Sequence, residues 1–89
     1  MDQAAMLAKV TEILRAQFPA LRRVALGPDT ALVSSGLLDS FALVALLAAL
    51  DEALGVEIDV EQVELDALET PARLAALCLE ARSRGPARA

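Results

Sequence analysis

The sequence predicts a small all-α protein, and three observations carry this prediction. Apolar residues make up 56% of the 89 residues and are mostly Leu, Ala and Val, of which Leu and Ala favour helices. In three separate stretches they recur at steps of three and four, the spacing of one helix face. The single alternating stretch, Val56 to Val60, has no second strand with which to form a sheet, so we expect an extended connector there.

The first helix is expected from Ala4 to Phe18, with Pro19 at its end. A loop follows, marked by Gly27-Pro28-Asp29 and Ser34-Ser35-Gly36. The loop also contains leucines and valines, so we expect it to lie on the core rather than to act as a linker.

The second helix is expected to begin at Asp39 or Ser40 and to end at Leu54, with Gly55 as its left-handed end residue. One side of this helix must face the core: Leu43, Leu46, Leu47, Leu50 and Leu54. The opposite side is unusually apolar for a surface: Phe41, Ala45, Ala48 and Glu52, flanked by Val44 and Asp51. This pattern indicates contact with something outside the domain.

A short helical turn is expected around Val60 to Leu65. The last helix is expected to begin at Thr70 as its cap, with Pro71 in the first position. Its apolar stripe is Leu74, Leu77, Cys78 and Ala81. We predict one domain over residues 1–83 and a frayed tail over 84–89.

The composition excludes several classes of function. With no His and a single Cys, the chain lacks the groups for His-based acid–base catalysis, for the usual zinc site and for an internal disulfide. The first residues show no signal-peptide pattern, and the longest apolar run, Phe41 to Leu50, is too short to span a bilayer. A cytoplasmic monomer is the expectation.

The charge is distributed unevenly along the chain. Residues 1–28, 29–70 and 71–89 carry net charges of +2, −10 and +3, for a total of −5. This balance argues against a nucleic-acid partner. The acidic middle, which has no base, is either a solvated face or a docking surface for basic partners.

The most informative segment runs from Gly36 to Phe41, where a loop meets the apolar second helix. A serine at this junction, Ser40, would expose its hydroxyl at the positive end of the helix dipole, where a phosphate ester is favoured. Asp39 beside it could help to hold a divalent metal during phosphate transfer. The simpler interpretation is that Asp39-Ser40 is only a helix cap.

At these residues the chain resembles the acyl carrier protein family, which includes peptidyl and aminoacyl carriers. Gly36, Asp39 and Ser40 match the family's Gly-x-x-Asp-Ser motif, and Phe41 stands where an aliphatic residue is commoner. Three further stretches resemble the family in order: Asp29 to Leu32, Leu50 to Ile58, and Asp66 to Thr70. The resemblance covers residues 4–82.

The resemblance implies a four-helix bundle, with three main helices and one short one, that is a carrier and not an enzyme. A phosphopantetheinyl transferase would attach phosphopantetheine to Ser40 from coenzyme A, with a metal ion that Asp39 assists. The arm would hold an acyl, aminoacyl or peptidyl group as a thioester for an activating ligase and for downstream transferases or synthases. These partners would touch Phe41, Val44, Ala45, Ala48, Asp51 and Glu52.

Fatty-acid carriers place acids along the exposed first half of this helix, whereas here the acids begin at Asp51 and Glu52. This departure favours a specialised stand-alone carrier of an amino acid or a secondary metabolite. One alternative is an unmodified helical interaction module of the same shape. A small enzyme using Asp39 and Asp29 is disfavoured, because nothing predicts an enclosed pocket or a base beside Ser40.

Overall fold

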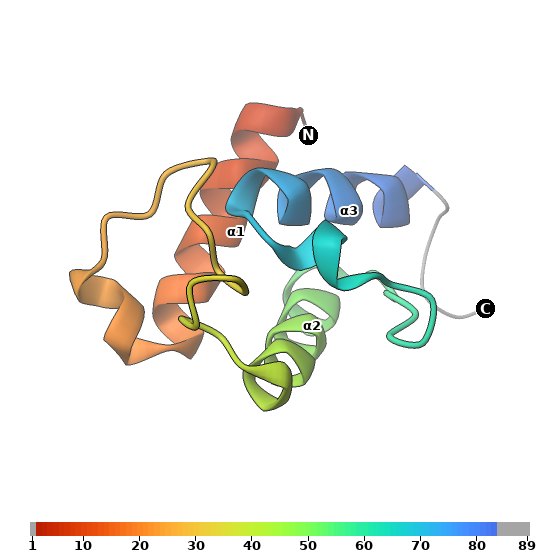
Figure 1. Ribbon diagram of the computed structural model, residues 1–89. Helices are drawn as coiled ribbons and strands as arrows, with labels where there is room; N and C mark the ends of the chain where they lie inside the picture. Colours follow the sequence, from red (N-terminus) through yellow and green to blue (C-terminus); the bar gives the residue numbers. More distant parts are fainter. Residues whose placement is uncertain (1, 84–89) are drawn as a thin grey trace.

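The computed structural model describes residues 2–83, which form three α-helices and two short 3-10 helices and contain no strand. The elements follow in the order α1 (Gln3–Gln17), η1 (Pro19–Arg23), α2 (Ser40–Leu54), η2 (Leu65–Leu68) and α3 (Pro71–Ser83). In Figure 1, α1 packs against both α2 and α3. The predicted all-α bundle is confirmed, while the predicted tail 84–89 lies outside the described residues.

Helix α1 begins and ends within one residue of the predicted bounds. Its cap is Asp2, whose Oδ1 accepts a hydrogen bond from the Ala5 amide at 2.9 Å. After Phe18 the chain does not pass straight into a loop as expected but makes η1. Proline suits the first position of a helical turn, and burial of Leu21 holds the turn to the core.

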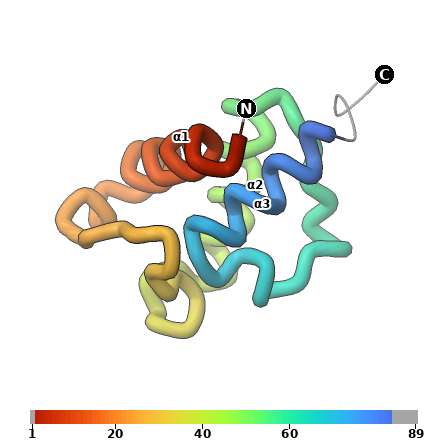
Figure 2. Tube along the Cα trace, turned by 90° about the horizontal axis from the view of Figure 1, so that it is seen from above, coloured from red at the N-terminus to blue at the C-terminus, as the bar shows by residue number. Residues whose placement is uncertain are grey.

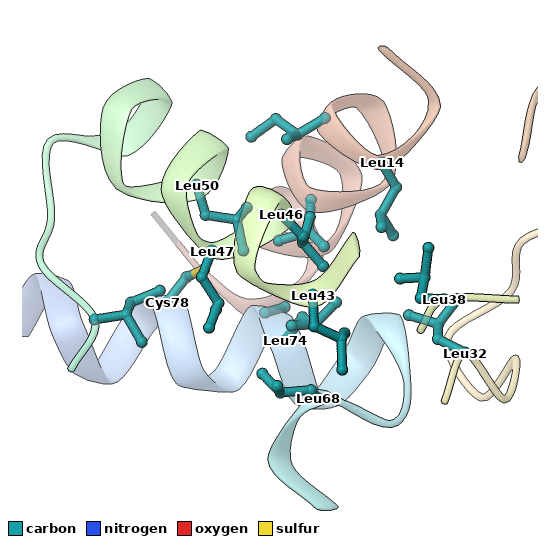
Figure 3. Packing of buried hydrophobic residues seen from close by; sticks show 14 of the residues in the cluster. Leu14, Leu32, Leu38, Leu43, Leu46, Leu47, Leu50, Leu68, Leu74 and Cys78 are labelled. Atoms are coloured by element: carbon teal, nitrogen blue, oxygen red, sulfur yellow. The ribbon is translucent and has the colours of Figure 1, made fainter. Parts of the chain in front are cut away.

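Helix α2 turns its leucines inward as predicted. Leu43, Leu46, Leu47 and Leu50 are buried, and Figure 3 shows them directed toward Leu14 of α1 and toward Leu74 and Cys78 of α3. Burying one such leucine contributes about 2 kcal/mol, so this face fixes how α2 is rotated. The first turn of α2 is consequently left at the surface, at the lower end of the bundle in Figure 1.

Gly55 ends α2 in the left-handed conformation, with φ 66° and ψ 35°, as predicted. Asp51 holds the chain beyond it. The Asp51 carbonyl accepts from the amides of Gly55 and Val56, and its carboxylate Oδ1 accepts from the Ile58 amide at 3.0 Å. These bonds turn the chain back so that Val56 and Ile58 reach the core.

The segment after Ile58 differs from the prediction in one detail. Residues 56–59 form neither helix nor strand, and a turn occupies residues 60–62, but the regular short helix η2 lies further along, at Leu65–Leu68. Leu68 is buried, and the Arg73 guanidinium holds η2 by bonding to both the carboxylate and the carbonyl of Asp66. The helix periodicity and turn signals used for the sequence prediction do not reveal this contact.

Helix α3 has the predicted beginning. The Thr70 hydroxyl accepts from the Arg73 amide at 3.1 Å, and Pro71 is the first residue of the helix. Leu74, Cys78 and Ala81 of the predicted stripe are buried, whereas Leu77 is half-buried. None of the helices described for residues 2–83 combines the length and the apolar character needed to cross a bilayer.

Asp51 gives the fold a specific dependence on pH. Burial raises the pKa of Asp51 above its usual 3.8 and outweighs the hydrogen bond from Ile58, while the charge of Glu57 raises the pKa further. When the pKa of a carboxyl is higher in the folded state than in the unfolded state, ionisation of that carboxyl lowers the free energy of unfolding. Its contribution to the free energy of unfolding is therefore full below pH 3.8 and is lost as the pH rises through the folded pKa.

We therefore expect Asp51→Asn, which keeps an oxygen for the Ile58 amide, to be at least as stable as wild type at neutral pH. The wild type should gain stability relative to this variant as the pH falls toward 4. Urea unfolding across a pH series measures this difference. Glu52→Gln, which removes the neighbouring exposed acid, is the control for the loss of one negative charge. A difference between Asp51→Asn and wild type that stays constant with pH would contradict the prediction.

Candidate functional site

A closed turn places the beginning of α2. Leu32 and Leu38 are both buried, and the Leu38 amide donates to the Leu32 carbonyl at 2.9 Å. Between them Gly36 adopts φ 84° and donates its amide to the Val33 carbonyl at 3.1 Å. A positive φ favours glycine over other residues, which gives the glycine of the predicted motif a structural reason. The turn delivers Asp39 and Ser40 to the end of the bundle.

Ser40 is the first residue of α2 and is exposed, as predicted. Asp39 is the cap, and its Oδ1 accepts from the Ala42 amide at 2.8 Å. Within residues 2–83 the Ser40 hydroxyl has no hydrogen-bond partner, and the amides of Ser40 and Phe41 have none either. The capping interpretation therefore holds for Asp39, while the role of Ser40 as an attachment site stays a prediction with which its exposure agrees.

This geometry fits a phosphate ester. The hydroxyl is free to react, and the negative charge that the ester adds would lie at the positive end of the α2 dipole. Two unpaired amides stand near it as donors. No side chain of the described region must move to expose the oxygen.

An apolar groove of about 180 Å³ opens beside Ser40. One wall is α2, through Leu43, Val44 and Leu47, and the other is the segment before α3. That second wall consists of Val60, Val63, Leu65 and Leu68. Val60 and Leu65 are half or more exposed. The site predicted from the sequence did not include this wall. Its signal in the sequence was the presence of single apolar residues between acidic ones.

The outer side of α2 is apolar and open, as predicted. The exposed fractions of Phe41 and Val44 are 88% and 55%, and Ala48 is exposed as well. Ala45 is half-buried, and Glu52 is exposed. Asp51 differs from this group, because its carboxylate is occupied by the Ile58 amide and serves the fold.

The acidic segment 29–70 has two uses. Five of its ten acids accept hydrogen bonds that shape the fold: Asp39, Asp51, Asp59, Asp66 and Glu69. Among these five, Glu69 joins two segments that are distant in the chain. Its carboxylate accepts hydrogen bonds from both the amide and the hydroxyl of Ser34. Composition alone could not separate these structural acids from solvated ones.

No group of three or more acidic or thiol side chains within residues 2–83 is arranged to hold a metal ion. Asp39 can offer one carboxylate, of which Oδ1 already caps α2. A metal held by Asp39 would therefore need its other ligands from outside the described residues, such as water, a phosphate or a partner protein. The predicted role of Asp39 in transfer stays a prediction.

Comparison with known proteins bears on this geometry. A family model described as "Phosphopantetheine attachment site" matches residues 5–78. The match includes the turn, Ser40, all of α2 and both walls of the groove. A search of curated proteins found no match to the chain.

Cys78 is the chain's single thiol and is fully buried on α3. Burial, aided by the negative charge of Asp51, raises the pKa of Cys78 to about 11. The thiolate is the reactive form, so we expect the folded protein to resist iodoacetamide at pH 8 and to react stoichiometrically once unfolded in guanidinium. Intact-mass measurement follows both reactions; rapid labelling of the folded protein would contradict the prediction.

Proposed function

Because the chain belongs to the phosphopantetheine attachment site family, whose covalent cofactor is phosphopantetheine, we propose that Ser40 is the residue that bears the cofactor. The observation that carries this proposal is the free, exposed Ser40 hydroxyl at the first position of α2. The Gly36 turn and the Asp39 cap hold it there. Family membership makes the chain a carrier; the attachment residue and the cargo are our proposals.

Attachment needs a separate transferase, because nothing in the described region can activate the hydroxyl. The Ser40 oxygen forms a bond to the phosphorus of coenzyme A that bears the pantetheine. The bond from that phosphorus to the bridging oxygen of the diphosphate breaks, and the nucleotide half leaves. The hydroxyl proton passes to a base of the transferase. When attached, the arm supplies a terminal thiol that holds the cargo as a thioester.

The residues of this chain supply position and recognition. The dipole of α2 and the free amides of its first turn favour the phosphodiester charge. Ser40 also stands at the edge of the apolar groove, so the root of the arm lies between α2 and the η2 wall. The exposed side chains of Phe41 and Val44 surround the same point and would meet a partner enzyme there.

We propose that the partners are a phosphopantetheinyl transferase, an acyl- or aminoacyl-activating ligase, and downstream transferases or synthases. Recognition would come from apolar contact on the first half of α2, since Glu52 is the first acid on that exposed side. This surface favours a specialised carrier of an acyl, aminoacyl or peptidyl group over a housekeeping fatty-acid carrier. An unmodified interaction module remains the second candidate, supported by the same exposed apolar face.

Mass measurement separates the two candidates. Incubation with coenzyme A, magnesium and a broad-specificity transferase should add one phosphopantetheine to the wild type and none to Ser40→Ala. Ser83→Ala, at the far end of α3, should be modified fully. An unmodified wild type beside an active control carrier would favour the interaction module.

Phe41→Asp tests the proposed interface. The ring is exposed and the new acid lies in the first turn of α2, so folding stability should change by no more than about 0.5 kcal/mol. The kcat/KM for modification by the transferase should fall about 10-fold or more, because the partner loses the burial of one aromatic ring. Steady-state kinetics on the purified apo protein measure this effect.

Two variants make that result interpretable. Phe41→Leu, which keeps an apolar contact, should retain most of the activity. Ala8→Asp places the same charge on an exposed position of α1 and should have no effect. Equal rates for Phe41→Asp and wild type would show that the outer side of α2 is not the interface.

A further inference from the structure

Glu69 joins the two segments that flank Ser40. It lies directly after η2, which forms one wall of the groove, and it reaches across to the long loop between η1 and α2. Its carboxylate accepts from the Ser34 amide at 3.1 Å through Oε1 and from the Ser34 hydroxyl at 2.7 Å through Oε2. Its carbonyl accepts from the Leu32 amide at 2.7 Å.

These bonds fix the loop at the point where it turns toward Ser40. Leu32 and Leu38 bracket the closed turn, and Ser34 lies within it. Figure 2 shows the loop running beside the segment that begins α3, where the Pro28 carbonyl also accepts from the Ala72 amide at 3.0 Å. The loop spans residues 24–39 and contains no helix or strand, so these bonds, together with the burial of Leu32 and Leu38, restrict its conformations.

We propose that Glu69 is a positioning residue, which holds the Ser40 turn and the η2 wall in one fixed arrangement so that a partner enzyme meets them as a single surface. This inference rests on the proposed function of Ser40. Ser40 and Leu65 line the same groove but belong to segments that are far apart in the chain. Glu69 is the residue that ties these segments together through side-chain and backbone bonds at once.

The expected kinetic signature follows from this role. Without the carboxylate, the loop samples arrangements that the partner cannot bind, and the apparent affinity falls in proportion to the competent fraction. For Glu69→Ala as a substrate of the transferase, we expect the KM for the carrier to rise about 10-fold. The kcat should be retained, because Ser40 itself is unchanged. A residue that served only global stability would leave KM unchanged at temperatures where the protein is fully folded.

Conservative variants separate position from charge. Glu69→Gln removes the negative charge but keeps an oxygen for the Ser34 amide and an amide group for the Ser34 hydroxyl, so KM should return to within about twofold of wild type. Ser34→Ala should raise KM less than Glu69→Ala and should add nothing in the Glu69→Ala background. Gln3→Ala removes one side-chain bond between α1 and α3 as a matched control and should not alter KM.

The experiment compares these apo proteins as transferase substrates, with hydrogen exchange of the Ser34 amide measured in parallel. Faster exchange and a raised KM in Glu69→Ala, both reversed in Glu69→Gln, support the proposal. Equal KM values for wild type and Glu69→Ala overturn it while leaving the function of Ser40 intact. If Glu69→Gln behaves like Glu69→Ala, charge and not position is responsible, and the proposal fails. An unmodified wild type overturns the proposed function and this inference together.

Discussion

The burial of one face of α2 is the constraint on which the rest of the structure depends. Four leucines of this helix are buried against α1 and α3, and rotating the helix would expose them at a cost of about 2 kcal/mol each. Once that face is fixed, the side chains of Phe41 and Val44 must point toward solvent. The helix N-terminus is fixed with them, and so is the serine that begins it. The packing of the core and the exposure of Ser40 are thus two results of one arrangement.

The carboxylates of the acidic segment illustrate how one residue type serves different purposes. Asp39 and Asp51 accept amide hydrogen bonds at the two ends of α2, one at its cap and one where the chain turns back. Asp66 bonds to Arg73 across the end of η2, and Glu69 makes a longer-range contact with Ser34. Glu61 and Glu64 are exposed on the segment that supplies the groove's second wall. The charge of this region is therefore partly structural, and the remainder is available to a basic partner.

Local patterns predicted much of this protein. Helix periodicity, the Gly55 end and the Thr70-Pro71 beginning of α3 all depend on residues close together in the chain, and all three are present. The exposed Ser40 was predictable for the same reason. η1 was missed because its stability comes from burying Leu21. The second wall of the groove and the Glu69–Ser34 contact were missed because they bring together residues from separate segments of the chain. Ser34 and Glu69, for example, are 35 residues apart.

The exposed ring of Phe41 has a consequence for the lifetime of complexes. A partner that covers it gains about 2 kcal/mol, or roughly a 30-fold change in Kd, from one side chain. That gain distinguishes a correct encounter from a random one, yet it is far too small to hold two proteins together on its own. Most of such a change in Kd comes from a change in the dissociation rate. A carrier that binds several enzymes in turn needs contacts of this size, because tight binding to one enzyme would slow its dissociation and delay binding to the next.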